Sequence, residues 1–133
     1  MENNSDYHYV PAQRTVGFFE AISRGFSNYI TFSGRASRSE YWWWFIFWSI
    51  VGYLIMLLIS NQQTAQTVDY IIGAIIFLPS LTLWFRRLHD TGRSAWWLLI
   101  NFIPVVGTIV LFVFCCLPSQ PIENRFGPVP NRV

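Results

Sequence analysis

The chain has 133 residues, of which 53% are hydrophobic and only 12% are charged, and its formal net charge is +2. Soluble domains carry about 25% charged residues, so this composition excludes an ordinary water-soluble surface and predicts a single-domain membrane protein. All nine basic residues are arginine, and no basic tract or RNA-binding motif is present, so nucleic-acid binding is not expected.

The first 30 residues divide into a polar tail and an amphipathic segment. Residues 1–14 are polar and irregular, which predicts disorder, and without an apolar core they do not form a cleavable secretory signal. Residues 17–30 show helical periodicity, which predicts a helix lying in the membrane interface with its phenylalanines toward the lipid. Packing of this helix against a protein core is the alternative. Its apolar face consists of Phe18, Phe19, Ile22, Phe26, Tyr29 and Ile30.

Two apolar runs then have the composition of transmembrane helices. Ser37 and Glu40 have the spacing of a capping box, which predicts a helix start near Arg38. The twenty residues 41–60 contain no charge and are long enough to cross a hydrocarbon core of about 30 Å. A second span is predicted at 68–87, with a kink near Pro79 because proline removes a helical hydrogen bond to Ile75.

A third apolar run covers residues 95–117 and contains Pro104 and Gly107. A single kinked crossing is the simplest interpretation, and a re-entrant hairpin turning at IPVVG is the alternative. Its adjacent cysteines, Cys115 and Cys116, match no zinc or redox spacing and are expected to be buried small hydrophobic residues. The sequence therefore predicts no metal and no cofactor. Residues 118–133 are expected to form an irregular tail.

The arginines predict the orientation of the spans. Four precede the first span and three lie between the second and third, whereas the connection at 61–67 has none. The positive-inside rule therefore places the N-terminus and the 86–94 loop in the cytoplasm, and six of the seven tryptophans fall at the same ends of the spans. Three full crossings would place the tail, 119–133, outside.

The stretch RRLHDTGRSAWW, residues 86–97, predicts a tight link between antiparallel helices. Arg86 and Arg87 are spaced to pair with Asp90 one helical turn later, Gly92 suits the residue after a helix, and Ser94 suits the cap of the next one. This accounts for the positive charge, but it does not account for the specific order of histidine and aspartate.

Three blocks, FSGRASRSEYWWW, LPSLTLWFRRLHDTGRSAWW and ENRFGP, resemble the signature blocks of the YhaH/YhaI-like family of small bacterial inner-membrane proteins. They cover most of residues 26–128. The resemblance implies an all-helical, multi-spanning bacterial inner-membrane protein of unknown molecular function. It implies no catalytic residues.

The leading functional hypothesis is binding of anionic phospholipid headgroups, or of a membrane partner, at the cytoplasmic face. Guanidinium groups match phosphate geometry and favour anionic lipid, although topological anchoring alone is the alternative. The arginines expected to do this are Arg35, Arg38, Arg86, Arg87 and Arg93. Residues expected to have a structural or partner-binding role are Glu40, His89, Asp90, Asn124 and Arg125.

Three other functions are weighed against this one. An enzyme using His89 and Asp90 is not expected, because adjacent residues on a helix point about 100° apart and Ser94 is better used as a cap. A transporter subunit is an alternative, although the predicted spans hold no ionisable residue and Asp69 lies at an edge. An accessory or scaffold protein, or a homo-oligomer, is the remaining possibility, but no small-residue packing motif stands out.

Overall fold

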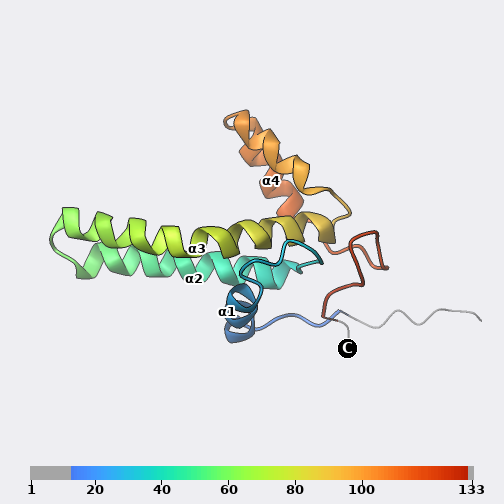
Figure 1. Ribbon diagram of the computed structural model, residues 1–133, viewed down its shortest axis with the longest axis horizontal. Helices are drawn as coiled ribbons and strands as arrows, with labels where there is room; N and C mark the ends of the chain where they lie inside the picture. Colours follow the sequence, from blue (N-terminus) through green and yellow to red (C-terminus); the bar gives the residue numbers. More distant parts are fainter. Residues whose placement is uncertain (1–12, 132–133) are drawn as a thin grey trace, which may run out of the picture.

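The computed structural model describes residues 13–131, which contain five helices and no strand (Figure 1). Residues 1–12, most of the segment predicted to be disordered, lie outside the described residues, as do 132 and 133. The two described residues of that segment are held by the C-terminal part of the chain: Gln13 donates to the Ser119 hydroxyl, and the Arg14 amide donates to the Asn131 carbonyl. The helices are α1 (Phe18–Ser27), α2 (Arg38–Leu58), α3 (Gln62–Asp90), the 3-10 helix η1 (Ala95–Phe102) and α4 (Val106–Cys116).

Helices α2 and α3 form a long antiparallel pair, and both are long and apolar enough to cross a membrane (Figure 1). The predicted start of α2 at Arg38 is confirmed, because the Ser37 side chain accepts from the Glu40 amide. In a complete capping box the Glu40 carboxylate would accept a hydrogen bond from the Ser37 amide. Here this carboxylate pairs with Arg86 of α3 instead.

Helix α3 is longer than the predicted span at both ends. It begins after Asn61, whose side chain accepts from the Thr64 amide, and it continues through Pro79 to Asp90. The carbonyl that Pro79 leaves without a helical donor belongs to Ile75, and the Tyr29 hydroxyl donates to it. Because α3 starts this early, Asp69 lies two turns inside the helix.

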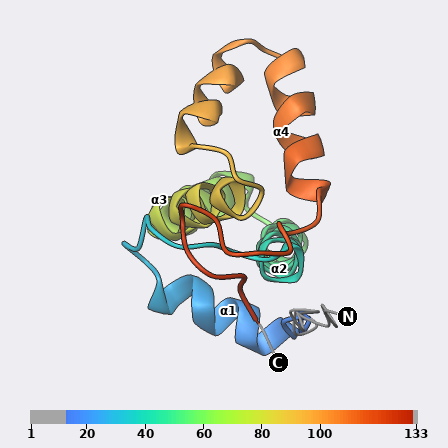
Figure 2. The same ribbon diagram turned by 90° about the vertical axis from the view of Figure 1, so that its right-hand side faces the viewer.

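Residues 95–117 do not form the single kinked crossing predicted for them. Helices η1 and α4 instead make a hairpin that stands away from the α2–α3 pair (Figure 2). Pro104 and the left-handed Val105 (φ 68°) end η1, and a Cβ on Gly107 would lie 1.9 Å from the Ile100 carbonyl oxygen, so only glycine allows the arms to approach this closely. Arms of eight and eleven residues extend about 16 Å each, about half of a hydrocarbon core.

Helix α1 runs across the α2–α3 pair (Figure 2) and packs on α2. Gly25 lies against Trp44, where a Cβ would come within 2.0 Å of the indole ring. Phe26 packs edge to face on the same indole, whereas Phe19 is 84% exposed. Part of the face of α1 that was predicted to meet lipid therefore packs on protein, which was the alternative interpretation.

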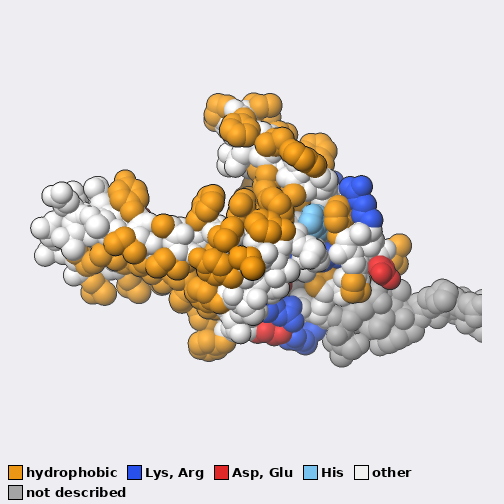
Figure 3. Space-filling view, in the orientation of Figure 1, with side chains coloured by type: hydrophobic (Ala, Val, Ile, Leu, Met, Phe, Trp, Pro, Cys, Tyr) orange, Lys and Arg blue, Asp and Glu red, His pale blue; other side chains and the backbone are white. Residues whose placement is uncertain are grey.

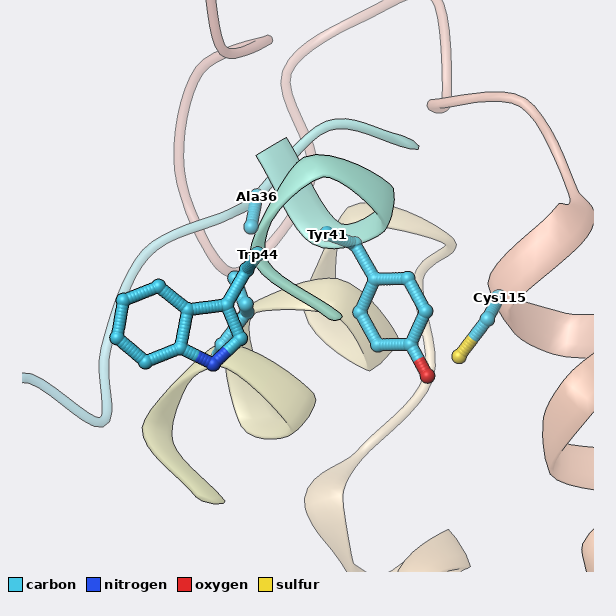
Figure 4. Close-up of a cluster of buried hydrophobic side chains, with 5 residues drawn as sticks. Ala36, Tyr41, Trp44 and Cys115 are labelled. Atoms are coloured by element: carbon cyan, nitrogen blue, oxygen red, sulfur yellow. The ribbon is translucent and has the colours of Figure 1, made fainter. Parts of the chain in front are cut away.

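A small apolar core joins α2, α3 and α4. Tyr41 points toward Cys115 of α4, whereas Trp44 points the other way (Figure 4) and donates from its indole nitrogen to Ser80 on α3 at 3.0 Å. Cys115 is buried as expected, but Cys116 is exposed.

Candidate functional site

Three stretches far apart in the sequence meet at one end of the helix pair: the start of α2 with the residues before it, the end of α3, and the segment after α4. Their charged side chains form a cluster, called here the buried ion-pair cluster. Each member is at most 7% exposed. The cluster comprises Arg35, Glu40, Arg86, Arg87 and Asp90.

Asp90, the last residue of α3, is held on both carboxylate oxygens. Arg35 donates from Nε to Oδ1 at 3.0 Å, and Arg87 donates from Nη1 to Oδ2 at 2.6 Å, as its i, i+3 spacing predicted. The Ser119 hydroxyl also donates to Oδ2. Arg86, the other predicted partner of Asp90, pairs with Glu40 instead, with Nη1 and Oε1 2.8 Å apart.

The remaining donors of Arg35 and Arg87 bind backbone carbonyls. Arg35 donates to the carbonyls of Gln120, Ile122 and Gly127 in the tail, and Arg87 donates to those of Ala36, Cys115 and Leu117. Two buried charges are thereby both paired and hydrogen-bonded, which is the condition for placing them away from water. The same contacts fix where the hairpin ends and where the tail begins.

The tail packs on the neighbouring His89. The imidazole Nδ1 lies 3.1 Å from the Gly34 carbonyl, and its ring stacks on Phe126 with centroids 4.0 Å apart. The Asn124 amide donates to the His89 carbonyl at 2.9 Å, and the Arg125 guanidinium lies over the Phe126 ring. These contacts hold the tail against the end of α3.

The tail therefore lies at the same end of the molecule as the 86–94 loop. The prediction that 119–133 lies on the opposite side from this loop is wrong for the described residues up to 131. The physical reason is the hairpin, which returns the chain to the end of α3 instead of carrying it across.

The arginines predicted to bind headgroups fall into two groups. Arg35, Arg86 and Arg87 are 7%, 4% and 0% exposed and bind the protein's own carboxylates and carbonyls, so they do not lie on an exposed surface with Arg38. Arg38 is exposed, and Arg93 is half-buried with its guanidinium 4.1 Å from the centroid of the Phe114 ring.

Sequence reasoning missed two contributors, Ser119 and Gln120. Both belong to a segment expected to be a free tail, and their partners Arg35 and Asp90 lie 29 to 85 positions away in the sequence. No local pattern connects such positions. The available signal was that the tail contains ENRFGP, one of the three blocks that carry the family resemblance, which indicated that the tail belongs to the same structural unit as the other two blocks.

The arrangement does not assemble catalytic groups around His89 and Asp90. The Asp90 oxygens are held by two arginines and a serine, and His89 uses Nδ1 on a backbone carbonyl, so neither orients the other. Within residues 13–131, no group of three or more His, Cys, Asp or Glu side chains is placed to hold a metal ion.

Comparisons with known proteins agree with the membrane character of the chain. The model of a family described as "Protein of unknown function (DUF805)" matches residues 29–128. The inner membrane protein YhaH of Escherichia coli K12 is 44% identical over 109 residues, covering 78% of this chain and 90% of the relative. The inner membrane protein YhaI of the same strain is 42% identical over 107 residues, covering 78% and 89%. No solved structure matches the chain.

Proposed function

This chain belongs to the DUF805 family, whose function is unknown, and from that premise we propose that it is a non-enzymatic protein that binds anionic phospholipid headgroups at the cytoplasmic face of the bacterial inner membrane. The relatives support a location in the membrane, because both are inner membrane proteins. The arginines support a position at the level of the headgroups, because Arg38 and Arg93, which have no carboxylate partner within residues 13–131, lie at the end that carries α1 and the tail.

In the proposed topology α2 and α3 are the two spans. On the face in Figure 3, charged side chains gather at one end of the molecule, and hydrophobic side chains cover α2 and α3 beyond it. The positive-inside rule assigns the charged end to the cytoplasm. Helix α1 runs across the spans with Phe19 exposed, and Ile30, three residues after the helix ends, is exposed as well, which favours a position in the interface. The η1–α4 hairpin is too short to cross and fits a re-entrant position in the same half of the membrane.

The observation that carries the proposal is the combination of tryptophans with two arginines that have no carboxylate partner within the described residues. Arg38 lines a cavity of about 390 Å³ together with Arg14, Ser39 and Trp42. On the hairpin side, Arg93 and Trp97 both pack on the ring of Phe114. A guanidinium beside an indole at the interface provides a phosphate ligand and an anchor at the same depth.

The test compares lipid retention by two charge-matched double variants in mild detergent, using native mass spectrometry. Arg38→Gln with Arg93→Gln is expected to reduce retained phosphatidylglycerol several-fold. The control, Arg24→Gln with Arg125→Gln, removes the same charge from residues that bind Glu20 and Phe126 and do not line the cavity of Arg38, and it is expected to retain lipid near the wild-type level. Equal loss from both variants would leave only general electrostatic attraction and contradict the proposal.

A further inference from the structure

The long apolar pair of α2 and α3 contains one carboxylate away from the buried ion-pair cluster. Residues 41–85 include a single acidic residue, Asp69, and no basic residue. Asp69 has no ion pair within residues 13–131. A carboxylate in an apolar stretch of a membrane protein is costly unless a cation accompanies it. Because this stretch supplies no cation of its own, Asp69 favours one that belongs to another molecule.

Asp69 lines a cavity of about 290 Å³ between α2 and α3, near the turn that joins them (Figure 1). Its Oδ1 reaches across to α2, because a Cβ at Gly52, another residue of the cavity lining, would lie 3.7 Å from it. Gln62 and Gln66 line the same cavity from α3. Asp69 and both glutamines are exposed, so a ligand can enter from outside the protein. Arg86, the nearest arginine along α3, is seventeen residues from Asp69, about 26 Å along the helix.

The remaining lining residues indicate which kind of cation fits. Trp48 and Tyr53 supply aromatic rings, and Met56 and Ile59 supply apolar side chains. Aromatic faces attract organic ammonium groups, and the apolar side chains suit the carbon substituents of such an ion. A metal ion such as Ca²⁺ needs about six to eight oxygen ligands. One carboxylate among aromatic and apolar side chains therefore fits an organic ammonium ion better than a metal.

We propose that this cavity binds an organic ammonium group, with its charge beside the Asp69 carboxylate and its carbon substituents against Trp48 and Tyr53. The group is supplied either by a soluble amine or by the ammonium headgroup of a phospholipid. The site shares no residue with the surface of Arg38 and Arg93, so it stands whether or not that surface binds lipid.

The test measures thermal unfolding of the full-length protein in a non-ionic detergent. Benzyltrimethylammonium chloride is titrated against sodium chloride at equal ionic strength. Short-chain phosphatidylethanolamine is titrated against its N-acetylated form, which keeps the phosphate but has no ammonium group. We expect saturable stabilisation by the first probe, by phosphatidylethanolamine, or by both. Stabilisation by benzyltrimethylammonium assigns the site to soluble amines as well, and stabilisation by phosphatidylethanolamine alone assigns it to the headgroup.

Two variants link that stabilisation to the cavity. Asp69→Asn removes the charge and keeps the shape of the side chain. Gly52→Leu fills the cavity, and the only contact of its Cβ within 4 Å is the Asp69 carboxylate. Each variant is expected to weaken binding at least tenfold.

The matched control is Glu123→Gln, which removes an exposed carboxylate of the tail that also has no ion pair within residues 13–131. Glu123 does not line the cavity, so this variant is expected to bind as the wild type does. The proposal is overturned if neither probe stabilises the protein, or if Asp69→Asn and Glu123→Gln bind equally well. The second criterion holds even where Gly52→Leu fails to fold.

Discussion

The two ends of the α2–α3 pair are built on opposite principles. At the charged end, Asp90 and Glu40 are buried and bind arginines from other parts of the chain. At the other end, large apolar side chains such as Leu58 and Tyr70 are 80% and 75% exposed, and Asp69 has no ion pair within residues 13–131. Ion pairs and hydrogen bonds hold the charged end in one arrangement. The other end presents the exposed apolar side chains that a lipid environment requires.

The most direct test of this comparison asks whether the two ends lie on opposite sides of the membrane. In a background carrying Cys115→Ala and Cys116→Ala, single cysteines replace Gln63 at the α2–α3 turn and Glu123 in the tail. With a membrane-impermeant thiol reagent, Gln63→Cys is expected to label in intact cells and Glu123→Cys only after lysis. Labelling of Glu123→Cys in intact cells would restore a third crossing.

The next largest effect is expected from removing a buried charge. Asp90→Asn leaves Arg35 and Arg87 without their carboxylate, and breaking a buried pair from one side costs about 3–5 kcal/mol. The matched control, Asp69→Asn, changes an exposed carboxylate of the same helix and is expected to stay within about 0.5 kcal/mol. Denaturant unfolding in detergent measures both. A similar loss of unfolding free energy in both variants would show that the two ends are equally constrained.

Two glycines sharpen the comparison at a smaller scale. Gly25→Ala places a methyl group against the Trp44 ring, where the Cβ would lie 2.0 Å from it, and overpacking of this kind costs about 1–3 kcal/mol. Gly73→Ala, on α3, meets nothing within 4 Å and is expected to be neutral or to stabilise by up to about 1 kcal/mol. Hydrogen exchange should show faster exchange confined to α1 in the first variant only.

The smallest effect is expected from the exposed ion pairs of α1. Hydrogen bonding from Arg14, aided by the charge of Arg24, lowers the pKa of Glu20 from 4.5 to about 2. A lowered folded-state pKa stabilises the protein above pH 4.5, and this contribution is lost as the pH falls toward 2. Glu20→Gln is therefore expected to flatten the loss of thermal stability between these two values. An unchanged pH profile would show that the pair contributes nothing.

Local chemistry made part of this fold predictable. The start of α2 followed from Ser37, and the pairing of Arg87 with Asp90 followed from helical spacing. The pairing of Arg86 with Glu40 could not be predicted, because it joins residues 46 positions apart. Counting positive charges predicts orientation, but it does not distinguish arginines at the surface from arginines that bind the protein itself.

The hairpin of η1 and α4 also depends on long-range contacts that no local pattern predicts. Pro104 and Gly107 fit both a kink and a reversal, and the length of the run favoured a crossing. The arrangement depends on contacts at the far end of α4, where Arg87 binds the carbonyls of Cys115 and Leu117. Long-range acceptors of this kind are backbone atoms, and every sequence supplies them equally.

The binding of Arg35 to tail carbonyls also bears on how the protein is made. Arg35 leaves the ribosome well before Gln120, Ile122 and Gly127, the residues whose carbonyls it needs. During synthesis the guanidinium can meet Asp90 first, but its remaining donors stay bound to water until the last stretch of the chain emerges. The charged end is therefore completed only after both long helices have been translated.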